Sequence, residues 1–494
     1  MPPTVGLPPP GAATVALASP GGRWLIAATV LGSGIAFLDG TVVNVALPTI
    51  GRDLGGGLIT QQWVLDGYLL TLGALLLSGG ALGDRYGRRK VFVGGLIAFT
   101  LASLACGLAP TGPALIAARL IQGVGAAALV PGSLALIDAA IVTEDRGRAV
   151  GVWAGMSGVT SALGPFIGGW LVDAASWRWV FFINVPLAAV AVLVTLRHVV
   201  ESRGGTATGR PDIAGAISVT VGLAGVIYAL IEAPAHGASP LTVVAAVVGV
   251  AALIAFPFIE SRTDAPLLPL RLFRSRQFTG ANLTTLAVYA ALGGALFLLA
   301  LQLQQSLGYS ALRAGLATLP TTIIMLLASP RVGAIAQRTG PRLLMAIGPL
   351  VAGAGLALMA RVTPGAGYLT EVLPSVVVFG IGLSITVAPL TSTVLASVTE
   401  ENVGAASGAN NAVSRIAGLL AVAVLPVAAG VHGGGGALGP GFSRAMLISA
   451  VICAVGGLIA LLTIRTATAV SVRRHTVPGV NHACQAPCTR NRVP

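Results

Sequence analysis

The sequence contains very little charge. Lys, Arg, Asp and Glu make up 9% of its 494 residues, whereas hydrophobic types make up 55%, and the mean hydropathy is +0.88. Soluble domains carry about 25% charged residues, so this composition excludes an ordinary soluble protein and predicts a chain that lies in a lipid bilayer. The only lysine, Lys90, follows Arg89, so the Gly-Lys-Ser/Thr step of an ATP-binding loop is missing. Uphill transport would then use an ion gradient, here of protons, with no cofactor and no enzymatic reaction.

Cysteine is also scarce, with four in the chain. Cys106 and Cys453 lie in apolar runs, where a free cysteine behaves as a small hydrophobic residue. His482, Cys484 and Cys488 fit no standard metal-ligand spacing, so no metal site is expected. The formal net charge is +13, but the basic residues stand in short loops between apolar runs. Such residues set membrane topology, which argues against a nucleic-acid partner.

Apolar runs of about 20 residues, enough for a helix to cross a hydrocarbon core of ~30 Å, recur along the chain. They are continuous, unlike the alternating segments of a membrane barrel. The pattern predicts an all-α integral membrane protein with fourteen spans, near residues 24–47, 61–82, 91–108, 113–137, 149–172, 179–196, 213–231, 241–259, 278–301, 314–328, 343–359, 369–395, 404–429 and 443–462. The first span is expected to end at Pro48.

The basic residues indicate the orientation. When the N-terminus is placed in the cytoplasm and the loops alternate, most of the 29 Lys and Arg residues fall inside, as the positive-inside rule requires. The five that fall outside are Arg52, Arg178, Arg313, Arg361 and Arg444. We therefore expect a monomer in a bacterial inner membrane with both termini in the cytoplasm.

An internal repeat divides the chain. Residues 80–89 read GALGDRYGRR, residues 333–342 read GAIAQRTGPR, and a second echo links VTED at 142–145 with VTEE at 398–401. Parallel repeats of this kind build transporters from two halves with the substrate site between them. The predicted divisions are a disordered tail (1–22), a six-helix bundle (23–198), a linker with two extra spans (199–277), a second six-helix bundle (278–465) and a basic cytoplasmic tail (466–494).

Asp39 is the main functional candidate, because a carboxylate within a span costs at least about 2.5 kcal/mol and usually faces a cavity or a partner. Burial favours its protonated form, and a neighbouring cation favours its ionised form. With Arg119 as the expected partner, Asp39 can take up and release a proton; a static ion pair is the alternative. Asp66 is a second candidate for proton coupling, with a solvated role near the outer end of its span as the alternative.

Two further segments have mechanical interpretations. Gly164, Pro165, Gly168 and Gly169 predict a bend that lets the fifth span pack closely and limits leakage. The charged segment 83–90 is interpreted as a cytoplasmic gate, in which Asp84 pairs with a neighbouring helix end. Exposed ion pairs contribute about 0–1 kcal/mol, which suits a bias between two states; a positive-inside anchor is compatible with the same residues. The gate residues are Gly83, Asp84, Arg85, Gly87, Arg88 and Arg89.

Several polar residues in or near the spans are candidates for the lining of a substrate cavity, although polar residues near span ends are often simply solvated. They are Asn44, Gln122, Gln302, Asn410, Asn411 and Arg415, with Gln304 and Gln305 as weaker candidates. None of the second-half spans contains a central acid, so proton handling is expected in the first half.

These motifs resemble a known family. The segment 83–89 is similar to the cytoplasmic loop signature of the major facilitator superfamily. LDGTVVNVALP at 38–48 is similar to the first-span signature of its fourteen-span drug:proton antiporters of the EmrB/QacA type. Further similar segments are Arg119 to Gly125, Gly164-Pro165 with Gly168-Gly169, Trp63 to Tyr68, and Trp177 to Pro186.

The resemblance implies export of small amphiphilic compounds in exchange for protons, with Asp39 and Arg119 in coupling and Gly164-Pro165 in antiport. Some relatives have a late acid that helps them recognise cationic drugs, and no intramembrane residue of this chain matches it. Two alternatives stay open: a proton-coupled importer or metabolite carrier of the same fold, and a membrane sensor that does not transport.

Overall fold

The computed structural model describes residues 14–204, 212–264, 266–399, 402–431 and 438–465. Fourteen helical segments of these residues are long and apolar enough to cross a membrane, which confirms the predicted all-α membrane fold. The helices are α1 (Pro20–Leu54), α2 (Gly57–Tyr86), α3 (Arg88–Leu108), α4 (Gly112–Ala127), α5 (Leu129–Ala140), α6 (Thr143–Ala174), α7 (Trp179–Phe182), α8 (Asn184–His198), α9 (Ile213–His236), α10 (Pro240–Arg262), η1 (Leu270–Arg274), α11 (Arg276–Leu301), η2 (Gln302–Ser306), α12 (Ala311–Thr339), α13 (Pro341–Met359), η3 (Tyr368–Val372), α14 (Leu373–Ala396), α15 (Val403–Ala428) and α16 (Gly439–Thr463).

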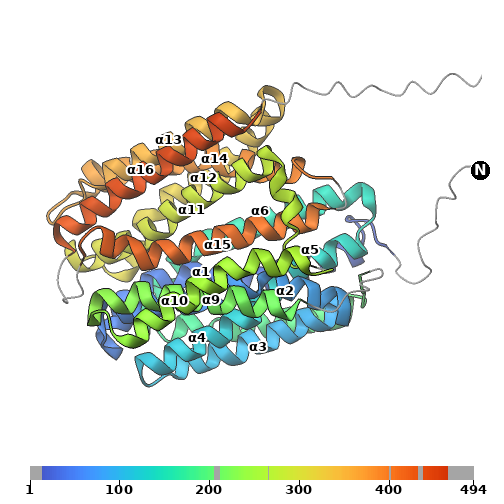
Figure 1. Cartoon of the computed structure of the whole chain (residues 1–494), viewed down its shortest axis with the longest axis horizontal. Coiled ribbons are helices and arrows are strands. Elements are labelled where there is room, and N and C mark those ends of the chain that lie inside the picture. Colours follow the sequence, from blue (N-terminus) through green and yellow to red (C-terminus); the bar gives the residue numbers. More distant parts are fainter. Residues whose placement is uncertain (1–13, 205–211, 265, 400–401, 432–437, 466–494) are drawn as a thin grey trace, which may run out of the picture.

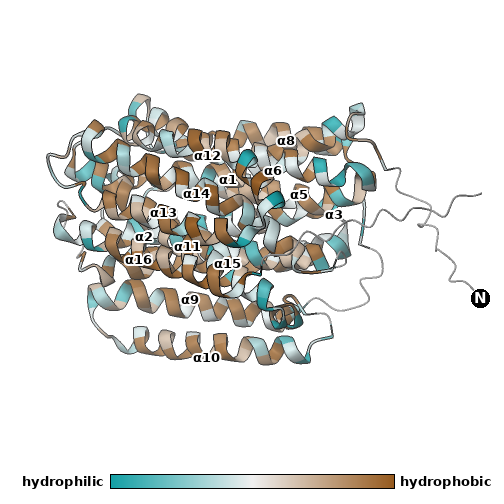
Figure 2. Ribbon diagram, turned by 90° about the horizontal axis from the view of Figure 1, so that it is seen from above, coloured by the Kyte–Doolittle hydropathy of each residue, from teal (hydrophilic) through white to brown (hydrophobic). Residues whose placement is uncertain are grey.

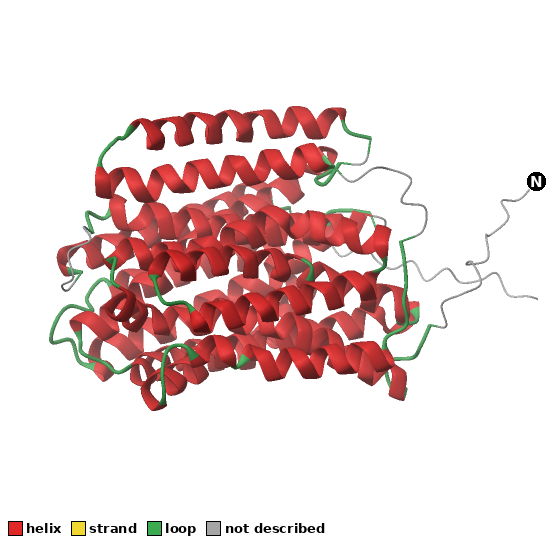
Figure 3. Cartoon of the chain, turned by 90° about the horizontal axis from the view of Figure 1, so that it is seen from below, coloured by secondary structure: helices red, strands yellow, loops and turns green. Residues whose placement is uncertain are grey.

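The long helices lie side by side, with their connections at the two ends of the bundle (Figures 1 and 3). We call the end where α1 begins and α16 ends the terminal face, and the other end the opposite face. The start of α1 and the end of α16 lie at the same face because the chain crosses the bundle an even number of times. The charged segment 83–90 joins α2 to α3 at the terminal face.

Proline does not end the first span. Pro48 lies within α1, which continues to Leu54, so the prediction that the span stops at Pro48 is wrong. Proline removes one backbone donor and crowds the preceding turn. Membrane helices tolerate this where neighbouring helices pack against the altered turn, and Pro48 is buried. A serine cap at Ser19, whose side chain accepts a hydrogen bond from Gly22 N, fixes the start of α1.

Residues 14–22, which belong to the predicted disordered tail, are ordered. Val15 N donates to Ala140 O at 2.8 Å, and Leu17 N donates to Asp145 Oδ2 at 2.9 Å. The turn between α5 and α6 therefore supplies the backbone partners that this segment needs. The remainder of the predicted tail (1–13), residues 466–494 with Cys484 and Cys488, and Glu400 and Glu401 of the second echo lie outside the described residues.

We propose that the predicted halves, 23–198 and 278–465, are the two packing units of the fold. In the first, α1 packs against α6 and α8, and α2 packs against α4; in the second, α13 packs against α14 and α16, and α11 against α15. The main contacts between the units are α6 with α12 and α2 with α15.

Helices α9 and α10 form an additional layer on one side of the molecule (Figure 2). Helix α9 packs on both α2 and α15, whereas α10 packs mainly on α9. An apolar cluster joins α9 to α2 and α15, at the seam where α2 and α15 meet. Its buried members are Leu70, Ala74, Leu223, Ile227, Ile231, Leu419 and Ala423.

Helix α6 changes its surroundings along its length. Toward the opposite face it packs closely, since a Cβ added to Gly164 would lie 2.0 Å from Thr41 Oγ1 of α1. Toward the terminal face, no described atom lies within 4 Å of a Cβ added to Gly151, Gly155 or Gly158. The space beside α6 therefore widens toward the terminal face.

Candidate functional site

Asp39 lies at the centre of a buried polar cluster. It is fully buried in α1, and its carboxylate accepts hydrogen bonds from three residues of two other helices. Arg119 Nη1 donates to Oδ2. Gln122 Nε2 and Asn184 Nδ2 donate to Oδ1 at 2.9 and 3.1 Å. The pairing of Asp39 with Arg119 that the sequence predicts is therefore present, and it connects α1 to α4 and α8.

The Arg119 guanidinium is held on several sides. It is fully buried, its Nε donates to Val64 O at 2.9 Å, and Nη1 also donates to Gln122 Oε1 at 2.7 Å. The ring of Tyr68 lies 4.2 Å from its central carbon, a cation–π contact. A buried guanidinium is stable only when it is paired and hydrogen-bonded in this way.

Two members of the cluster were missed from the sequence. Asn184, the first residue of α8, and Ser103 of α3 are both fully buried, and Asn184 Nδ2 also donates to Ser103 Oγ at 2.9 Å. Asn184 stands within the segment 177–186 that resembles the family, which is a signal that could have identified it. Ser103 is one of many small hydroxyl residues in the spans, and nothing in its sequence context separates it from the others.

Asp66 is buried and lacks a partner among the described residues. Its exposed fraction is 0%, and neither carboxylate oxygen has a hydrogen-bond partner there. The alternative that it is solvated is therefore wrong, because α2 begins at Gly57 and places Asp66 more than two turns inside the helix. On the same helix, Gln62 Nε2 donates to Val422 O of α15 at 2.7 Å, and Gly73 packs beside Arg415. Asp66 lies between these two contacts with the second half.

The glycines of α6 permit close approach on two sides. A Cβ on Gly168 would meet Val42 of α1 at 2.6 Å, and one on Gly169 would meet Ala311 O of α12 at 2.6 Å. Pro165 O is itself only 2.2 Å from the position of a Cβ on Gly315. Helix α6 runs continuously through Pro165. Residues 164–169 thus hold α6 against α1 and against the second half.

The charged segment at the terminal face is ordered by its own residues and by the chain after α8. Arg88 Nε lies 2.8 Å from Asp84 Oδ1, and Arg88 Nη1 donates to Ala135 O at 3.0 Å. Arg88 is the first residue of α3, so Asp84 of α2 pairs with the start of the neighbouring helix. Glu201 also accepts hydrogen bonds from the Arg89 and Lys90 backbone at 3.0 and 3.1 Å, which caps α3.

Gly87 and its neighbours complete this turn. Gly87 has φ +114°, a conformation that side chains rarely adopt, so a glycine is required. Gly83 O accepts the Gly87 backbone donor at 3.0 Å, and Arg89 Nη1 donates to Val199 O. Arg85 stacks over the Tyr86 ring at 5.7 Å.

Two predicted cavity residues have structural contacts instead. Gln122 belongs to the Asp39 cluster, and Gln302, 1% exposed, donates from Nε2 to Val362 O at 2.8 Å. The sequence shows that these side chains are polar, but it does not show whether they lie on the side of the helix that faces a cavity. Asn410 is half-buried and donates to Thr285 Oγ1 at 2.7 Å, which ties α15 to α11.

The remaining cavity candidates are half-buried. Asn44 and Asn411 donate within their own helices, to Gly40 O and Ser407 O. Arg415 lies over the Phe37 ring at 5.4 Å, across the boundary between the halves, and its buried Nε has no partner among the described residues. The cavity-lining role of these three residues stays a prediction.

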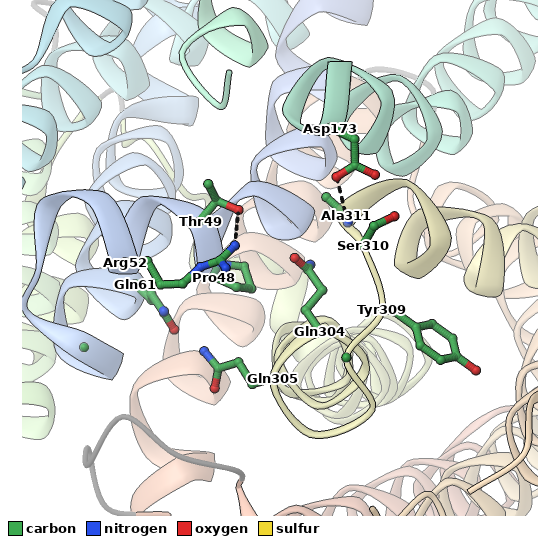
Figure 4. Close-up of a pocket in the computed structure, with 13 residues that line it drawn as sticks. Pro48, Thr49, Arg52, Gln61, Asp173, Gln304, Gln305, Tyr309, Ser310 and Ala311 are labelled. Carbon is green, nitrogen blue, oxygen red and sulfur yellow. Dashed lines mark hydrogen bonds between the residues drawn. The ribbon is translucent and has the colours of Figure 1, made fainter. Parts of the chain in front are cut away.

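A cavity of about 670 Å³ lies at the opposite face between the two halves (Figure 4). Arg52, Gln61 and Gln305 line it. Gln304, Asp173 and Ala311 also line it. Gln304 Nε2 donates to Val45 O at 2.9 Å, and Asp173 accepts from Ala311 N at 3.1 Å. These contacts join the halves at the opposite face. The first part of α6, toward the terminal face, has no such close contact between its glycines and the described residues.

Comparisons with known proteins agree with this arrangement. Residues 29–422 match the Major Facilitator Superfamily. A puromycin resistance protein of Streptomyces alboniger is 38% identical over 82% of this chain and 81% of its own. A cephamycin export protein of Amycolatopsis lactamdurans is 34% identical over 91% of this chain and 92% of its own.

Solved structures share the fold. A POT family transporter in complex with 5-aminolevulinic acid superimposes with a TM-score of 0.68, at 15% identity, over 91% of this chain and 98% of its own. The fourteen helices, the sequence match over most of the chain and relatives named for resistance and export lead to one conclusion. The chain belongs to the Major Facilitator Superfamily and is a multi-pass efflux transporter of that family.

Proposed function

We propose that this transporter exports a small amphiphilic compound from a bacterial cytoplasm in exchange for protons, with Asp39 as the residue that binds the proton. The observation that carries the proposal is the buried carboxylate of Asp39, which is held by donors from α4 and α8. The terminal face is the cytoplasmic face in this proposal, which agrees with the excess of basic residues in its loops. The wider space beside α6 then faces the cytoplasm.

Protonation of Asp39 alters the links among three helices. The ionised carboxylate accepts three hydrogen bonds, and charge-assisted hydrogen bonds are roughly twice as strong as neutral ones. A proton on Asp39 weakens these links while Arg119 stays charged. Helix α1 also carries Val45, whose carbonyl accepts from Gln304 of the second half. A change in the packing of α1 therefore alters a contact at the boundary between the halves.

Asp66 and Arg415 are proposed to contribute at that boundary. Both have buried polar atoms that lack partners among the described residues, and both lie where α2 packs against α15. Asp66 is the available site for a second proton. Arg415, Asn44 and Asn411 are proposed to line the substrate path.

The energetics suit a single coupled proton. One inward proton at ~150 mV supplies about 3.5 kcal/mol, enough for a gradient of a few hundredfold in a neutral solute. A monocation exchanged for one proton moves no net charge, so only the pH difference drives it. A substrate with more charge requires a second proton and a second titrating group.

The test is substrate-driven proton release in reconstituted vesicles. Puromycin, named for one relative, and ethidium serve as amphiphilic probes. Asp39→Asn is expected to abolish coupled proton movement, whereas Asp138→Asn, which changes an exposed carboxylate of α5, leaves it intact. Undiminished coupling in Asp39→Asn would contradict the proposal. Uptake of the probe into right-side-out vesicles would identify an importer instead.

A further inference from the structure

Two carboxyl groups lie together outside the Asp39 cluster. Asp212 caps the start of α9 and is 6% exposed, and Glu260 lies near the end of α10 and is 2% exposed. One oxygen of each, Asp212 Oδ2 and Glu260 Oε1, lies against the same glycine, Gly215. These two oxygens have no hydrogen-bond partner among the described residues.

Gly215 makes this approach possible. A Cβ at that position would lie 2.5 Å from Asp212 Oδ2 and 2.7 Å from Glu260 Oε1, so both oxygens rest against its Cα. The other oxygen of each group is engaged, because Asp212 Oδ1 accepts from Gly215 N at 2.7 Å and Glu260 Oε2 accepts from Leu268 N at 3.0 Å. The two groups therefore face one another with one oxygen each.

The part of the chain that the structure describes places no cation against the pair. Among the described residues, no nitrogen of Lys, Arg or His lies within 4.0 Å of either carboxyl group. Buried carboxylates in contact do not both ionise, since like charges in a poorly solvated site repel strongly. The charged residues of the elements that pack nearby are Asp84, Arg85, Arg262, Asp264, Arg271 and Arg274.

Glu260 also fixes the connector that leads to the second half. The backbone of Leu268 is bonded to Glu260, and the side chains of Leu267 and Leu268 cover an apolar pocket of about 80 Å³. Gly73 of α2 and Ala412 of α15 line the other side of this pocket. The connector therefore lies over the seam between the two halves, beside the layer formed by α9 and α10.

We propose that Asp212 and Glu260 share one proton and that this shared proton fastens the connector 266–269 over the seam between α2 and α15. With the proton in place, the pair carries a single charge and one carboxyl donates to the other. When the proton leaves, two like charges meet against Gly215. The Glu260 side chain then moves away and releases Leu268. The pair forms a proton-binding site separate from Asp39, at the terminal end of the inserted helices.

The test measures access to the connector as a function of pH. In the full chain with Cys484→Ser and Cys488→Ser, Leu267→Cys is labelled with a charged maleimide; Cys106 and Cys453 are buried. The labelling rate is divided by that of Ser261→Cys, an exposed residue of α10, to remove the effect of thiol ionisation. The ratio is expected to rise about tenfold from about pH 5.5 to about pH 8.5. A tenfold change corresponds to the loss of about one hydrogen bond to a charged group.

Matched variants identify the proton. Glu260→Gln keeps an acceptor for Leu268 N and a donor for Asp212, so its ratio is expected to stay low and constant with pH. Asp212→Asn keeps the cap of α9 and is expected to behave in the same way. Asp264→Asn, which changes an exposed carboxylate just before the connector, should retain the full pH response.

Two outcomes would overturn the proposal: a ratio that does not change with pH in the parent, or a full pH response in both Glu260→Gln and Asp212→Asn. Infrared difference spectra give an independent check. One protonated-carboxyl band present in the parent should be missing from either variant, and its persistence in both would also reject the shared proton. Neither measurement depends on transport, so the result is independent of the proposed function.

Discussion

Asn184 donates a hydrogen bond to Asp39 from a helix 145 residues further along the chain, with a donor–acceptor distance of 3.1 Å. The same side-chain nitrogen also donates to Ser103, so one amide links α8 to α1 and to α3. An amide in this position orients the carboxylate without adding a charge. The Asp39 carboxylate is thus held by neutral donors as well as by Arg119.

Asn184→Ala is expected to lower proton-coupled transport by about tenfold, because a hydrogen bond to a charged group typically contributes ~1.5–3 kcal/mol. The measurement is substrate-driven proton release in vesicles. Ser103→Ala leaves the bond from Asn184 to Asp39 in place, so its effect should be about threefold or less. An effect of Ser103→Ala as large as that of Asn184→Ala would contradict a direct role for Asn184.

Arg119→Gln is expected to destabilise the protein more than the double variant Arg119→Gln/Asp39→Asn. The single change leaves a buried carboxylate without its cation, and breaking such a pair costs about 3–5 kcal/mol. The double change removes both charges. Thermal unfolding in detergent measures the difference, with Arg146→Gln as a control because its pair with Asp138 is largely exposed. Equal midpoints for the single and double variants would show that the two charges do not interact.

Gly169→Ala is expected to loosen the closure at the opposite face. The new Cβ would lie 2.6 Å from the Ala311 carbonyl oxygen and from Leu312 Cα, backbone atoms that move only if α6 and α12 separate. Labelling of Ser310→Cys, which lines the cavity of Figure 4, should become several-fold faster. Gly158→Ala on the same helix has no described atom within 4 Å of its new Cβ and should leave the rate unchanged.

Asp84→Asn is expected to slow transport by up to about fivefold with little change in thermal stability. Its ion pair with Arg88 is partly exposed, with Asp84 at 42%, and such pairs contribute about 0–1 kcal/mol. Proton binding at Asp39 should persist, which proton release from the detergent-solubilised protein can measure. The control is Gln337→Ala, at the equivalent position of the second half. An equal loss of transport and of proton binding would contradict a gating role for Asp84.

Much of the fold could be predicted from the sequence, because span length and apolar continuity are direct consequences of bilayer thickness. The Asp39–Arg119 pair could also be predicted, since ionisable groups within spans are rare and need one another. The roles of Gln122 and Gln302 could not, because polarity does not show which side of a helix faces a cavity. Glu201 was missed for a different reason: its contact with the start of α3 depends on how the chain turns after α8.

The close contact of Gly169 with α12 limits how the halves can move. Thr143, at the other end of the 32-residue α6, lies roughly 40 Å along the helix axis from that contact, at 1.5 Å per residue. A rotation of about 15°, similar to other rigid-body transitions, would displace the terminal end of α6 by about 10 Å, close to the diameter of a helix. A small angular change at the glycine contact therefore moves the terminal end of α6 by about the width of a helix, with no change in the helix itself.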